Sequence, residues 1–277
     1  MSLILAVVLG TAVLHASWNA LAKSVGDRWV ASALIGLVNG VGGLACLLVF
    51  GPPEAAAWPY LVLSAALQAV YLVVLTSAYQ HGDLSRLYPI MRGTAPVLVT
   101  VISVTVLGDQ LSVGTWIGLG VLVGGIALLA FGRGIPTLDA GLGLALLNGV
   151  IIASYTLSDG VGVRVSGNPL GYIGWMFTLQ GPVLVGLCWW RGGPGFLGRV
   201  RTHAVRGLLG GILSLLTYGT VVWAQSRVSL AAVSGLRETS VVWAALIGRL
   251  FLGERLVRRE WLAIGLACCG AVVVQLT

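Results

Sequence analysis

Ten apolar stretches, each about as long as a membrane-spanning helix, dominate this 277-residue chain. A helix needs roughly 20 apolar residues to cross the hydrocarbon core of a bilayer. The stretches cover residues 3–24, 29–50, 58–80, 84–107, 112–131, 139–160, 168–190, 205–226, 229–251 and 257–276. Short segments that carry glycine, proline or charge separate them. The pattern predicts an all-α integral membrane protein with ten transmembrane helices.

The composition excludes a soluble protein. Only 9% of the residues are charged, whereas soluble domains carry about 25%, and the mean hydropathy is +0.97. The longest polar segment, residues 191–206, is short enough to be a linker. The net charge of +7 comes from basic residues that cluster in loops, which is typical of membrane topology and not of nucleic-acid binding. We expect a multi-pass protein of the cell's inner (plasma) membrane.

The second half of the chain repeats the first. A constant shift in numbering aligns six pairs in order: Gln80/Gln225, Arg92/Arg237, Gly108/Gly253, Asp109/Glu254, Leu111/Leu256 and Trp116/Trp261. Two five-helix halves, 1–135 and 136–277, follow from this alignment. Because each half has an odd number of spans, the halves enter the membrane in opposite orientations. Inverted repeats of this kind surround a central cavity and support alternating access.

Several motifs resemble a known family. A G-[DE]-x-L turn lies between the fourth and fifth helices of each half, and the chain contains LHASWNALAK, GDLSRLYPIMRGTAP and SYTLSDGVGVR. Together they resemble the drug/metabolite transporter superfamily, specifically its EamA-type permeases, over essentially the whole chain. The resemblance implies a secondary transporter with ten helices around a central cavity, usually a metabolite exporter or exchanger. It does not specify a substrate.

The distribution of positive charge predicts the orientation. Most of the 16 lysine and arginine residues lie in loops that follow odd-numbered helices. Since positively charged loops stay in the cytoplasm, both termini are expected outside. Members of the family are usually drawn with both termini inside, so the charge pattern and the resemblance disagree on this point.

Arg92 and Arg237 are the main candidates for a substrate site. Each lies within an apolar stretch. Because the repeat is inverted, the two helices enter from opposite faces of the membrane, and both guanidinium groups can reach the central region. Arginine within a membrane helix usually faces a bundle interior or a watery cavity. A functional interpretation is an anion site for a carboxylate or phosphate group. The alternative is structural, with Arg237 paired to Glu238 or Asp159 and Arg92 extending its stem to the membrane surface.

Two carboxylates are candidates for coupling. Glu238 either neutralises an arginine or serves as a proton-coupling group. Asp159 is the second candidate, although its expected place near a helix end also allows pairing with Arg164 or exposure to water.

Other polar side chains are expected to give the site its shape and hydrogen bonds. His15, Trp18 and Asn19 form a stripe on one face of the first helix, which either lines the cavity or bonds neighbouring helices. Tyr79, Tyr88 and Tyr155 complete the predicted substrate-binding set. Three glycine pairs are expected to pack helices closely: Gly36/Gly40, Gly120/Gly124 and Gly207/Gly211.

The sequence contains no catalytic, cofactor-binding or metal-binding motif, so we expect neither an enzyme nor a bound cofactor or metal. The leading hypothesis is a secondary transporter of a small polar or anionic metabolite, with an amino-acid-like molecule as first choice. The alternative is a flippase for a lipid-linked or amphipathic substrate. Expected partners are the small-molecule substrate and the lipid bilayer, without nucleic acid. Because one chain holds both halves, a monomer is expected to suffice.

Overall fold

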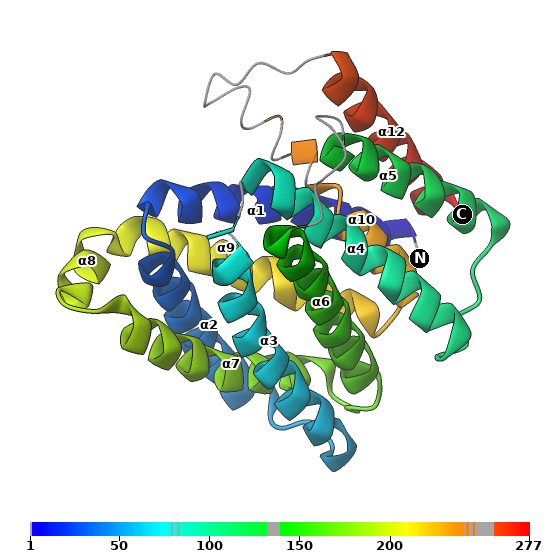
Figure 1. The fold of residues 1–277 in the computed structure, drawn as a ribbon. Coiled ribbons are helices and arrows are strands. Elements are labelled where there is room, and N and C mark those ends of the chain that lie inside the picture. Colours follow the sequence, from blue (N-terminus) through cyan, green and yellow to red (C-terminus); the bar gives the residue numbers. More distant parts are fainter. Residues whose placement is uncertain are drawn as a thin grey trace. The chain divides into compact units, whose positions relative to one another are not determined.

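The computed structural model describes residues 2–78, 80–81, 84–131, 139–240, 242–243, 246 and 258–277. These residues form eleven α-helices and one short 3₁₀-helix (Figure 1). The helices are α1 (Ser2–Val25), α2 (Arg28–Phe50), η1 (Ala55–Ala57), α3 (Trp58–Ala78), α4 (Leu84–Thr105), α5 (Val113–Phe131), α6 (Ala140–Arg164), α7 (Pro169–Gly192), α8 (Phe196–Thr202), α9 (Ala204–Gln225), α10 (Leu230–Arg237) and α12 (Arg258–Leu276).

The helices follow the apolar stretches closely. Six of them are long and apolar enough to cross a membrane, namely α1, α2, α3, α6, α7 and α9. Shorter apolar helices cover parts of α4, α5 and α12. The chain is therefore an all-α membrane protein. The ninth stretch differs from expectation, because α10 ends at Arg237 and most of the stretch beyond Ser240 lies outside the described residues.

Side chains at the loops fix where two central helices begin. Asp27 accepts hydrogen bonds from the backbone N–H groups of Trp29 and Val30 at 3.0 and 3.2 Å, which caps α2. Asn168 caps α7 in the same way, through the N–H of Gly171 at 3.0 Å. Such caps satisfy N–H groups that have no partner within the first helical turn.

Contacts divide the chain into two compact units. The first unit contains Met1–Ala12, Val70–Leu157 and Arg227–Thr277, and the second contains Val13–Ala69 and Ser158–Ser226. Each unit therefore takes segments from both halves of the sequence repeat. In the first unit α5 lies against α12, and in the second unit α2 lies against α7 (Figure 1).

Glycines allow both helix pairs to approach closely. A Cβ atom on Gly181 of α7 would lie 2.5 Å from the Cα of Gly40 in α2. In the other pair, a Cβ on Gly118 of α5 would lie 2.9 Å from the carbonyl oxygen of Gly270 in α12. Backbone atoms cannot yield to such a Cβ, so each crossing depends on the absence of a side chain.

Two of the three predicted glycine pairs pack closely against another helix in the structure. Gly36 and Gly40 pack against α7, and the pair Gly207/Gly211 packs against α2, as expected. The structure does not support the prediction for Gly120 and Gly124, because a Cβ at either position would meet nothing within 4 Å in the described part of the chain. These two glycines lie on a different face of α5 from Gly118, which makes the close contact.

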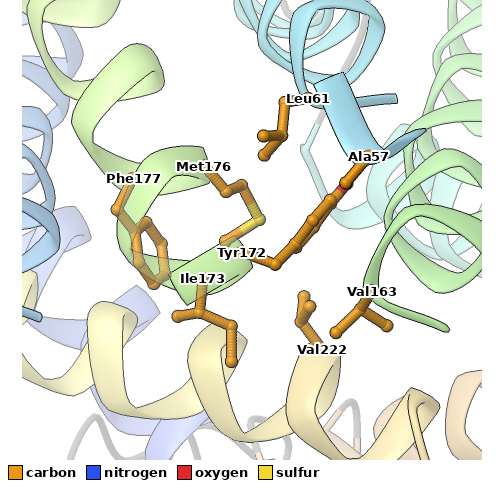
Figure 2. Packing of buried hydrophobic residues seen from close by; sticks show 8 residues of the cluster. All are labelled: Ala57, Leu61, Val163, Tyr172, Ile173, Met176, Phe177 and Val222. Carbon is orange, nitrogen blue, oxygen red and sulfur yellow. The ribbon is translucent and has the colours of Figure 1, made fainter. Parts of the chain in front are cut away.

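An apolar core holds the second unit together. Tyr172 and Phe177 of α7 are buried among side chains from several helices (Figure 2). The cluster is completed by Ala57, Leu61, Val163, Ile173, Met176 and Val222. Tyr172 is the largest of these fully buried side chains, and its hydroxyl group connects the core to a buried carboxylate described below.

Candidate substrate site

Two buried arginines share one buried carboxylate in the first unit. Arg92 lies in α4 and Arg237 is the last residue of α10, and their exposed fractions are 6% and 2%. Glu238 is fully buried between them. Its Oε2 lies 2.7 Å from Arg92 Nε, and its Oε1 lies 3.6 Å from Arg237 Nε. The three groups together carry one net positive charge, and Glu238 contacts both arginines that the repeat makes equivalent.

The carboxylate sits where a helix is interrupted. The backbone N–H of Glu238 bonds to the carbonyl of Gly235 at 3.0 Å, and that of Thr239 to Leu236 at 3.1 Å. These three-residue spacings replace the four-residue spacing of an α-helix. Thr239 contributes to the change, because its hydroxyl also donates to the Leu236 carbonyl, at 2.7 Å. Interrupted helices are where transporters commonly place ion and substrate sites.

Several buried polar atoms at this interruption have no hydrogen-bond partner among the described residues. Among the described residues, Arg237 Nε and Nη2 have no hydrogen-bond acceptor, and neither oxygen of Glu238 receives an aligned hydrogen bond. The 2.7 Å contact with Arg92 is therefore an ion pair whose N–H is not directed at the carboxylate. The hydroxyl of Ser234, one turn before Arg237, is 1% exposed and also lacks a partner within the described chain. Buried polar groups rarely remain unbonded, so these atoms have capacity for a further hydrogen-bond partner.

Neighbouring side chains fix the rest of the site. Arg92 Nη2 donates to Ser240 Oγ at 3.4 Å. Asn148 of α6 is fully buried and donates through Nδ2 to the sulfur of Met91 at 3.4 Å. Ser240 and Met91 were not singled out by the sequence. Their closeness in the sequence to Arg92 and Glu238 is the feature that could have identified them.

The start of α10 is held by the turn after α4. Asp109, the acidic residue of the GDQL turn, accepts a hydrogen bond from the N–H of Leu230 through Oδ2 at 3.2 Å. Ser229 is the N-cap of α10, and its hydroxyl accepts a hydrogen bond from Ala232 N–H at 3.3 Å. The conspicuous turn motif thus positions the helix that ends at Arg237. The equivalent GERL turn lies outside the described residues.

The predicted stripe on α1 belongs to the second unit. Trp18 Nε1 lies 3.3 Å from His15 Nδ1, and Asn19 Nδ2 donates to the His15 carbonyl at 2.7 Å. All three side chains are half-buried. Part of their hydrogen-bonding capacity is thus used within their own helix.

Only one of the three predicted tyrosines can be placed. Tyr155 is buried in α6, and its ring meets that of Tyr71 edge to face with centroids 6.0 Å apart. Tyr79 lies outside the described residues, and Tyr88 belongs to α4 but its side chain is outside the described part.

Asp159 is a second buried carboxylate, in the second unit. The hydroxyl groups of Tyr172 and Tyr218 donate to its two oxygens at 3.0 and 2.5 Å. The alternative in which Asp159 is exposed to water is wrong, because α6 continues to Arg164 and Asp159 is fully buried. The sequence does not identify Tyr172 as a partner of Asp159, since a lone tyrosine in an apolar helix gives no sign of what it contacts. No group of three metal-ligating side chains occurs among the described residues.

Membrane-length helices with a buried charged cluster at a helix interruption are features that many transporters have. The model of the EamA-like transporter family matches the chain twice, over residues 2–131 and 139–276. The chain belongs to the EamA-like transporter family, which confirms the resemblance found in the sequence. The family is one of transporters and not of enzymes.

Two known proteins are similar to this chain. The uncharacterized transporter YwfM of Bacillus subtilis (strain 168) is 26% identical over 225 residues, covering 79% of this chain and 74% of YwfM. A crystal structure of another protein matches with a TM-score of 0.76 over 98% of both chains, at 19% identity. At that identity the likeness shows a shared fold.

Proposed function

We propose that the chain is an exporter or exchanger of a small polar or anionic metabolite, with an amino-acid-like molecule as first choice. The observation that carries the proposal is Arg237, which is buried yet leaves Nε and Nη2 without acceptors among the described residues. An arginine in a membrane protein interior is costly, and its planar fork of donors matches a carboxylate. In this proposal Arg92 and Arg237 hold the anionic group of the substrate.

Other predicted residues have less support. Tyr155 shares the first unit with the arginines and is a candidate for substrate contact. His15, Trp18, Asn19, Tyr79 and Tyr88 stay predictions for contacts that shape the site. Glu238 and Asp159 stay candidates for coupling; the two tyrosine donors at Asp159 are also what a purely structural carboxylate would have.

We further propose that residues 1–135 and 136–277 act as inverted repeats that alternate access around a central cavity in the plasma membrane. The paired turn motifs and paired arginines support this arrangement. The charge of the loops favours both termini outside the cell. Protease cleavage of an N-terminal tag on intact cells, compared with opened vesicles, tests this orientation. Protection of the tag in intact cells would show that the N-terminus lies inside the cell, opposite to the proposed orientation.

The transport proposal is tested by counterflow into proteoliposomes with anionic, zwitterionic and cationic metabolites. Saturable exchange of anions or zwitterions is expected. Exchange of cations alone would contradict the arginine site. A flippase for an amphipathic substrate is the alternative, and movement of a fluorescent lipid without any metabolite exchange would favour it. The polar segment 191–206 favours this alternative, because its arginines could contact anionic lipid headgroups. One of them is engaged within the protein, since Arg199 pairs with Asp27 at 3.0 Å.

A further inference from the structure

The two arginine positions differ in one neighbour. In the sequence repeat, the tripeptide Arg92-Gly93-Thr94 aligns with Arg237-Glu238-Thr239. The first half thus has glycine where the second half has the buried carboxylate. Both arginines contact that single carboxylate, at 2.7 and 3.6 Å. The repeat supplies two positive charges symmetrically, and one half alone supplies the negative charge.

We infer that Glu238 restricts this site to substrates whose bound group carries a single negative charge. The inference rests on the proposed function, because it assumes that a substrate anion binds the two arginines. With Glu238 in place, the cluster carries one net positive charge. A bound monoanion brings the total to zero, whereas a dianion leaves a buried negative charge uncompensated.

Burial makes this difference matter. All three side chains are at least nine-tenths buried, with exposed fractions of 6, 2 and 0%. Charges that are removed from water interact strongly and are costly when unbalanced. A dianionic group such as a phosphate monoester is therefore disfavoured. The unused donors of Arg237 remain enough for one carboxylate.

The test compares matched ligands that differ by one charge. Taurine with 2-aminoethylphosphonate, and methanesulfonate with methylphosphonate, are pairs of nearly equal size. Above the second pKa of the phosphonates, the sulfonate group carries one negative charge and the phosphonate group carries two. Ligand-induced shifts in the melting temperature of purified protein give relative affinities. Wild type is expected to prefer taurine and methanesulfonate. In Glu238→Gln the preference should move toward the two phosphonates by about tenfold or more, as close charge pairs at interfaces typically couple that strongly.

A second variant protects the test against misfolding of the first. Glu238→Gly combined with Gly93→Glu moves the carboxylate to the equivalent position in the other half. A Cβ on Gly93 would meet only Ile126 Cγ2, at an ordinary 3.4 Å, so α4 has room for it at that point. This double variant is expected to regain the wild-type preference that Glu238→Gly alone loses.

Three results would overturn the inference. They are an unchanged preference in folded Glu238→Gln, a double variant that keeps the preference of Glu238→Gly, and no response of wild type to any of the four ligands. None of these refutes the proposed function, which depends separately on the counterflow panel. Failure of that panel would remove both.

Discussion

Arg92 Nε lies 2.7 Å from Glu238 Oε2, a contact that joins α4 to the end of α10 within the first unit. Arg237 lies farther from the same carboxylate, at 3.6 Å. All three side chains in these contacts are buried away from water. The cluster is therefore stable only while its charges remain close to balance, and the consequences of removing each member differ.

Glu238→Gln is expected to destabilise the protein more than Arg92→Gln. Loss of Glu238 leaves two buried arginines without their shared anion, and breaking a buried ion pair costs about 3–5 kcal/mol. Loss of Arg92 still leaves Glu238 beside Arg237, so the cost should be smaller. The free energy of unfolding in detergent measures the order. A larger loss for Arg92→Gln would show that Arg92 is held mainly by other contacts.

Tyr218→Phe is expected to lower the free energy of unfolding by about 1.5–3 kcal/mol, the range for a hydrogen bond to a charged group. Its hydroxyl lies 2.5 Å from Asp159 Oδ2. Tyr60→Phe is the control, because the Tyr60 hydroxyl has no hydrogen bond in the described part of the chain. Equal stability of the two variants would mean that the Asp159 contact contributes nothing.

Gly181→Ala is expected to destabilise the crossing of α2 and α7. The new Cβ would lie 2.5 Å from Gly40 Cα, and such overpacking typically costs about 1–3 kcal/mol. Gly186→Ala in the same helix is the matched control, since a Cβ there meets nothing within 4 Å. The control should be neutral or slightly stabilising, by up to about 1 kcal/mol. Melting temperatures that fall equally in both variants would contradict the close crossing.

Asp109→Ala is expected to weaken transport more than Ser112→Ala. Each residue caps one helix, and loss of a cap costs about 1 kcal/mol of stability. Ser112 caps α5 through Thr115 N–H at 3.0 Å, whereas Asp109 holds the start of α10. Only the first substitution should disturb Arg237. Counterflow rates of the two variants are compared at matched protein levels. Equal rates would show that the hydrogen bond from Leu230 to Asp109 does not affect transport.

The sequence predicted the long helices well because each is an almost unbroken apolar stretch, and bilayer thickness sets the length of such stretches. It did not predict α8, which lies in the polar segment 191–206. It also predicted that Arg92 and Arg237 matter and that Arg237 pairs with Glu238, since charge within hydrocarbon demands a partner. The closer contact of Arg92 with the same carboxylate was not predicted. It missed what depends on packing between distant segments. The tyrosine donors at Asp159 come from α7 and α9, and the glycine face of α5 depends on where α12 lies.

The helix interruption was missed for a different reason. The stretch 229–251 reads as one apolar span, and threonine is common in membrane helices. The interruption follows from local bonds at Thr239, whose hydroxyl and N–H both bond to Leu236, and no apolar pattern reports those.

Counterflow by Arg237→Ala tests the central claim most directly, with exposed Arg201→Ala of α8 as the control for charge removal. Arg92→Ala is run in parallel, and gel filtration confirms that each variant is folded. Arg201→Ala is expected to exchange anionic or zwitterionic metabolites like wild type, while both site variants lose exchange. Normal exchange by folded Arg92→Ala and Arg237→Ala would show that the two arginines are structural and that the substrate binds elsewhere.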